Sequence, residues 1–115
     1  MYLLAFLLLQ VSSVGMENYF ISFERSGGFA GISQSIELKS DTLSVEERDH
    51  LSKLVESSGF FDLKPEASSG LPDQFNYTLT IKSNGHEKTI MFGEGGIPGS
   101  LRPLIDYLTA KLRSG

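Results

Sequence analysis

The 115-residue sequence contains no cysteine, and this absence excludes three kinds of chemistry at once. Without thiols, the chain has no disulfide framework, no thiolate metal site and no cysteine nucleophile. It also lacks a basic stripe, because its 10 lysines and arginines are scattered and the net charge is −4. We therefore expect no nucleic-acid partner. A chain of this length and ordinary apolar content is expected to fold as one domain around a hydrophobic core.

A long hydrophobic run is missing as well, and the one apolar stretch stands at the N-terminus. Residues 1–15, MYLLAFLLLQVSSVG, carry no charged side chain, and their apolar run is too short for a bilayer-spanning helix of about 20 residues. The stretch resembles a signal-peptide core with small residues at Ser13 and Gly15, although a basic n-region is absent. Alternatively, translation starts at Met16. Both interpretations predict that residues 1–15 are a leader outside the fold and that residues 16–115 form a single domain.

The hydrophobic periodicity of the domain alternates between strand and helix patterns. Apolar residues at every second position predict strands over residues 19–24, 32–39, 75–82 and 86–92. Helical spacing predicts one helix between Ser44 and Gly59 and a final helix from a Ser100 cap to about Arg113. The order ββαββα predicts an α+β fold, in which a four-stranded, mostly antiparallel sheet carries two helices on one face.

Short local signals place the ends of these elements. Ser44 and Glu47 form an S-x-x-E capping box, and Gly59 is a C-terminal stop signal. Asn84-Gly85 predicts a type I′ hairpin turn. Phe60 and Phe61 follow the first helix directly, and we expect them to anchor the chain against the core.

No constellation of residues in the sequence predicts catalysis. His50 and His86 lack a second ligand at metal-binding spacing, and no serine lies in a G-x-S-x-G elbow. The adjacent acids Glu46 and Glu47 are expected on a solvated helix face. The glycine-rich SGGFAG segment leads into a strand and not into the helix that a phosphate loop opens. We therefore predict no catalytic residues, metal or cofactor, and a binding function in place of an enzymatic one.

The segment ERSGGFAGIS, residues 24–33, is the most distinctive loop of the sequence. One aromatic residue, Phe29, stands among three glycines and an alanine between two predicted strands. Its ring either folds back onto the edge of the core or is presented to a partner by a tip with almost no side chains. The second interpretation predicts a partner-binding segment made of Ser26, Gly27, Gly28, Phe29, Ala30, Gly31 and Ile32.

Four segments resemble the emfourin family in order along residues 19–112: FERSGGFAGI, Phe60-Phe61, LPDQFNYTLTI and LRPLIDYL. Emfourins are small bacterial proteins that inhibit protealysin-like zinc metalloproteases of the thermolysin kind. The resemblance implies a protease as partner, with Phe29 or Ile32 in the pocket that takes a large apolar side chain. Residues 71–74 and 93–99 are further candidates for contact. We expect a monomer whose domain binds no membrane.

The resemblance also bears on the leader and leaves one alternative function open. The family carries no apolar leader, which favours a start at Met16 and a cytoplasmic protein; a true signal peptide would place the protein outside the cytoplasm. The alternative function is a non-inhibitory module that binds a protein or peptide through a sheet edge or its loops.

Overall fold

The structure is a computed structural model that describes residues 18–28, 32–64 and 75–114. Leader residues 1–15 therefore lie outside the described residues. Within these ranges, no helix is both long and apolar enough to cross a membrane. The strands and helices, joined by short 3₁₀ turns, are β1 (Tyr19–Gly27), β2 (Gln34–Lys39), α2 (Val45–Ser58), β3 (Phe75–Ser83), β4 (His86–Gly93) and α3 (Arg102–Ser114).

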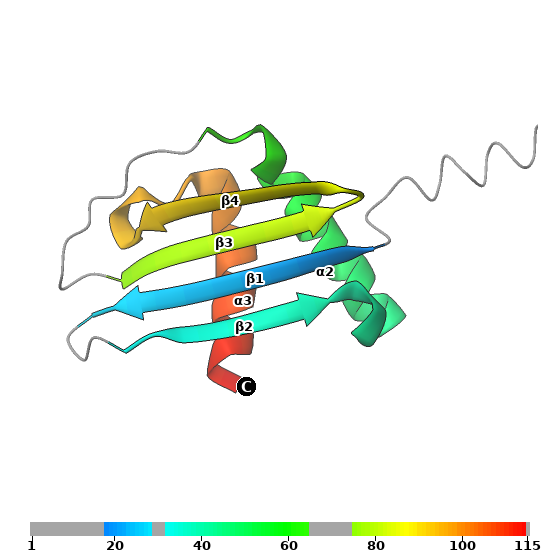
Figure 1. The fold of residues 1–115 in the computed structure, drawn as a ribbon, viewed down its shortest axis with the longest axis horizontal. Helices are drawn as coiled ribbons and strands as arrows, with labels where there is room; N and C mark the ends of the chain where they lie inside the picture. Colours follow the sequence, from blue (N-terminus) through cyan, green and yellow to red (C-terminus); the bar gives the residue numbers. More distant parts are fainter. Residues whose placement is uncertain (1–17, 29–31, 65–74, 115) are drawn as a thin grey trace, which may run out of the picture.

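The four strands form one antiparallel sheet in the order β2-β1-β3-β4. Each hairpin, β1–β2 and β3–β4, pairs neighbours in the sequence, and the β1–β3 ladder joins the two hairpins at the centre. Both helices cover the same face of the sheet, with α3 running across the strands (Figure 1). The predicted α+β fold with the order ββαββα is confirmed.

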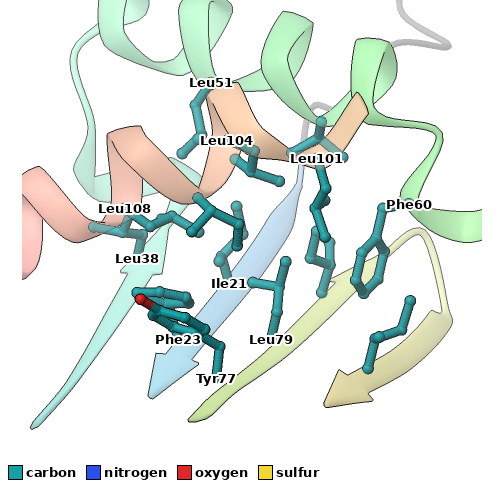
Figure 2. Packing of buried hydrophobic residues seen from close by; sticks show 14 of the residues in the cluster. Ile21, Phe23, Leu38, Leu51, Phe60, Tyr77, Leu79, Leu101, Leu104 and Leu108 are labelled. Atoms are coloured by element: carbon teal, nitrogen blue, oxygen red, sulfur yellow. The ribbon is translucent and has the colours of Figure 1, made fainter. Parts of the chain in front are cut away.

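The core lies between this face and the helices. Successive side chains of a strand point to opposite faces, so Ile21 and Phe23 of β1 are fully buried beside Leu79 and Ile81 of β3. Figure 2 shows Ile21, Phe23 and Leu79 on the side of the sheet that faces leucines of the two helices. Those helix residues are Leu51 of α2 and Leu104 and Leu108 of α3, all fully buried.

The opposite face of the sheet carries mostly polar side chains. At its centre, Thr80 of β3 and Thr89 of β4 are opposite one another, and their hydroxyls form a 2.8 Å hydrogen bond. Two apolar residues also lie on this face: Phe20 of β1, which is half-buried, and Met91 of β4, with 57 % of its surface exposed. Alternation of apolar and polar residues along the strands therefore reflects one covered face and one open face.

The structure confirms most of the predicted helix ends and the predicted hairpin turn. The Ser44 hydroxyl accepts a hydrogen bond from the Glu47 amide at 3.1 Å, and Gly59 ends α2 at φ 63°. Asn84 and Gly85 both have positive φ, at 52° and 83°, as a type I′ turn requires. Ser100 was expected to cap the final helix, but it lies in a 3₁₀ turn and its hydroxyl donates to the Ser58 carbonyl at 3.0 Å. That bond ties the start of α3 to the end of α2.

Two side chains depart from their predicted surroundings. Phe60 is buried, whereas Phe61 is 38 % exposed, so only the first ring of the pair enters the core. Glu47 does not simply face solvent, since its carboxylate pairs with Lys111 and accepts a 2.8 Å hydrogen bond from the Tyr107 hydroxyl. Both partners lie on α3. The bond with Lys111, followed by that with Tyr107, lowers the pKa of Glu47.

Candidate functional site

The predicted partner-binding segment and the candidate contact segment of residues 93–99 lie at the same end of the sheet. Here β1 and β4 finish while β2 and β3 begin, as the pairs Arg25–Gln34, Gly27–Phe75 and Asn76–Gly93 show. We call this the loop end; in Figure 1 it is the left end of the sheet. It is opposite the β3–β4 turn. The topology thus brings the end of β1, the start of β3 and the turn after β4 together.

The predicted partner-binding residues fall on the β1–β2 hairpin at this loop end. Ser26 and Gly27 are the last residues of β1, and Gly28 continues beyond it with φ 79°. Ile32 was expected to begin the second strand, but β2 starts at Gln34, and Ile32 precedes it with 60 % of its surface exposed.

The centre of the predicted segment cannot be compared with the structure. Phe29, Ala30 and Gly31 lie outside the described residues. Both interpretations of the Phe29 ring therefore stand as predictions. The structure describes the two flanks of the segment, which end at Gly28 and resume at Ile32.

The Phe75 ring supports the first flank. A Cβ atom added at Gly28 would lie 3.0 Å from Phe75 Cε1, which is closer than side chains ordinarily approach. Glycine therefore allows both the positive φ and the close approach of the ring. Phe75 is the first residue of β3 and is half-buried at the margin of the core.

Arg25 links this ring to the second flank. Its guanidinium carbon lies 4.6 Å from the centroid of the Phe75 ring, within the range of a cation–π contact. Its Nη2 donates a 2.7 Å hydrogen bond to Oε1 of Gln34, the first residue of β2. The predicted partner-binding segment, residues 26–32, included neither Arg25 nor Phe75.

Glu94 connects the same ring-bearing residue to the segment after β4. Its Oε1 accepts a 3.1 Å hydrogen bond from the Phe75 amide. Of the two further candidate segments, residues 93–99 therefore contact the start of β3 through Glu94, whereas residues 71–74 lie outside the described residues. Phe75 therefore contacts two segments that are distant from it in sequence, the end of β1 and the turn after β4.

The loop end is connected to the core by stacked aromatic rings. Tyr77 lies two residues after Phe75, with its ring centroid 5.7 Å from Phe23 on one side and 5.7 Å from Phe92 on the other. Burial raises the pKa of the Tyr77 hydroxyl, and the nearby Glu94 carboxylate raises it further. The base of the hairpin therefore adjoins a layer of three packed aromatic rings, of which the Tyr77 phenol is neutral at pH 7.

The chemistry of these side chains suits binding. The loop end offers glycine backbone, the exposed Ile32 side chain and the Arg25 guanidinium. His50 and His86 are both exposed on other parts of the molecule. Within the described ranges, no three His, Asp or Glu side chains gather closely enough to hold a metal ion.

The fold and this site define a small α+β protein in which the glycines Gly27 and Gly28 end a strand at one end of the sheet. The sequence model of the Emfourin family matches residues 23–109, which is most of the chain. The chain belongs to the emfourin family, a family of protease inhibitors, and the predicted family assignment is confirmed. Searches of curated proteins and of solved structures gave no match.

Proposed function

We propose that this protein inhibits zinc metalloproteases of the thermolysin kind, protealysin-like enzymes included, and is not itself an enzyme. In this proposal the β1–β2 hairpin tip enters or covers the active-site cleft of the protease. The membership in an inhibitor family supports the class of function. The convergence of three segments on the loop end, with the hairpin at its edge, is the structural observation that carries the choice of surface.

The composition of the tip suits entry into a narrow cleft. Gly27 and Gly28 leave the backbone without side chains on the approach to the tip, and Ile32 is exposed beyond it. An apolar side chain that leaves water for a protease pocket contributes about 1.5–3 kcal/mol. We propose Phe29 as the main anchor and Ile32 as the second, within the binding segment of residues 26–32.

A protease assay tests this proposal directly. Purified protein is titrated against a panel of thermolysin-like proteases, and cleavage of a peptide substrate is followed. We expect tight inhibition by the parent and a loss of affinity of about thirtyfold for Phe29→Ala, which corresponds to about 2 kcal/mol. Phe61→Ala is the matched control, since Phe61 is a phenylalanine with 38 % of its surface exposed whose carbonyl accepts a hydrogen bond from Lys88 of β4, away from the hairpin tip.

The outcomes separate the two parts of the proposal. An unchanged cleavage rate with every protease of the panel would contradict the inhibitory function. Equal inhibition by the parent and by Phe29→Ala would contradict the anchor alone. Equal losses for Phe29→Ala and Phe61→Ala would indicate a general effect on the fold.

A second candidate function rests on the β2 strand. Among the described residues, β2 pairs only with β1 and forms one edge of the sheet. An extended peptide could add to such an edge through backbone hydrogen bonds. If the protein is such a non-inhibitory module, Phe29→Ala should leave peptide binding unchanged, and Glu37→Pro on β2 should reduce it.

A further inference from the structure

Phe75, the first residue of β3, contacts both of the other segments at the loop end. Its ring approaches Gly28 and Arg25 of the hairpin, and its amide binds Glu94 after β4. We propose that Phe75 is a positioning residue, which holds the base of the hairpin in the geometry that the protease recognises. This inference rests on the proposed function and adds a role for a residue outside the binding segment.

Both ends of the hairpin connection are held by the same cluster. Gly28 precedes the tip, and the Phe75 ring lies so close that a Cβ atom there would be 3.0 Å from Cε1 and would require the ring to shift. Gln34 follows the tip, and its side-chain oxygen accepts the 2.7 Å bond from Arg25. Arg25 in turn lies over the Phe75 ring. One ring therefore fixes the positions at which the tip leaves and rejoins the sheet.

The surroundings of Phe75 distinguish it from an ordinary core residue. Leu79, on the same face of β3, is fully buried beneath the helices, whereas Phe75 is only half-buried at the sheet margin. In addition to the core side chains against which it packs, its ring contacts a glycine backbone and a guanidinium. A leucine at this position would keep apolar volume but lose the cation–π contact with Arg25.

Fixing the ends of a glycine-rich connection affects binding through entropy. Glycine loses more conformational freedom on ordering than any other residue, so a free tip would bind weakly. Anchored ends restrict the tip before it meets the protease. We therefore expect loss of the Phe75 ring to slow association and to weaken inhibition without removing any side chain that touches the enzyme.

The test compares the full-length parent with Phe75→Leu, Phe75→Tyr and Arg25→Lys. We expect the inhibition constant to rise about tenfold for Phe75→Leu and about threefold for Arg25→Lys, whereas Phe75→Tyr stays within about twofold of the parent. Leu54→Ala, which removes a half-buried side chain of α2 far from the loop end, controls for lost stability. It should lower the urea midpoint and leave inhibition unchanged.

A spectroscopic measurement reports on the hairpin base independently of the protease. The close Phe75 ring should shift the Gly28 proton signals in the parent and in Phe75→Tyr, and the shift should vanish in Phe75→Leu. Should Phe75→Leu fail to fold, the inhibition constant of Arg25→Lys decides the matter, because this substitution alters only the contacts of the Arg25 side chain with the Phe75 ring and Gln34.

The outcomes distinguish this inference from the proposed function. A parent that inhibits no thermolysin-like protease overturns both. A parent that inhibits, together with Phe75→Leu and Arg25→Lys variants of unchanged potency, overturns the positioning role and leaves the function standing. The positioning role is also overturned if Phe75→Leu and Leu54→Ala are equally destabilised and lose the same inhibitory potency.

Discussion

Replacement of Gly28 by alanine probes the base of the hairpin most directly. Gly28 has φ 79°, and an added Cβ atom would approach Phe75 Cε1 to 3.0 Å. The left-handed backbone alone costs an alanine about 1–2 kcal/mol. Displacement of the ring adds about 1 kcal/mol, the lower end of the range for an overpacked site. We therefore expect Gly28→Ala to lower the free energy of unfolding by about 2–3 kcal/mol.

Gly85→Ala is a closely matched control for the backbone term. Gly85 has φ 83° in the other hairpin turn, and no atom lies within 4 Å of its added Cβ position. It should therefore cost only the backbone term of about 1–2 kcal/mol. Urea unfolding of both variants at neutral pH measures the difference, with both free energies extrapolated to water.

A double-mutant cycle isolates the contact with the ring. In the Phe75→Leu background, Gly28→Ala should cost no more than Gly85→Ala does in the parent. The reasoning is refuted if Gly28→Ala and Gly85→Ala are equally destabilising, or if Gly28 and Phe75 show no coupling. Either result would mean that the ring does not support the hairpin base.

Four further predictions concern stability and the N-terminus. The pKa of Glu47 is lowered by its bond with Lys111, so the bond stabilises the fold above the unfolded-state pKa and is lost as the pH falls through the folded-state pKa. Glu47→Gln should thus be about 1 kcal/mol less stable than the parent at pH 7 and equal to it in acid, as urea unfolding would show. Burial raises the pKa of Tyr19 to about 12, so the contribution of its neutral hydroxyl to the free energy of unfolding is complete below pH 10 and is lost toward pH 12. Tyr19→Phe should therefore reduce the fall in stability at alkaline pH. Phe23→Ala leaves a cavity at a fully buried position, and calorimetry should show a loss of about 3–5 kcal/mol. The intact mass of the protein from its native host should correspond to a start at Met16, whereas a mass that includes residues 1–15 would contradict this prediction.

The sequence predicted the elements well because their signals are local. Alternating apolar residues marked the strands, the Ser44 cap and Gly59 bounded α2, and Asn84-Gly85 specified its turn. The β1–β3 ladder was not predicted, since it joins residues more than 50 positions apart in most of its pairs and no local pattern encodes which hairpin edges meet.

The binding segment could be predicted from the sequence only in part. Its glycines and the two apolar anchors stood out by composition, whereas Arg25 and Phe75 looked like ordinary residues of strand ends. Their role depends on the β1–β3 register, which places Phe75 opposite Gly27. Ile32 was assigned to the second strand because its spacing fits Ile36 and Leu38. In the structure, β2 starts only at Gln34, so Ile32 belongs to the connection between the two strands.

The central claim is that the hairpin tip meets the protease. Amide hydrogen exchange of this protein, free and bound to a thermolysin-like protease, tests the claim residue by residue. The proposal predicts new protection over residues 27–33, with smaller changes at 94–96, and none at the Asn84-Gly85 turn at the opposite end of the sheet. Protection confined to that turn or to β2, with the hairpin tip exchanging as in the free protein, would contradict it.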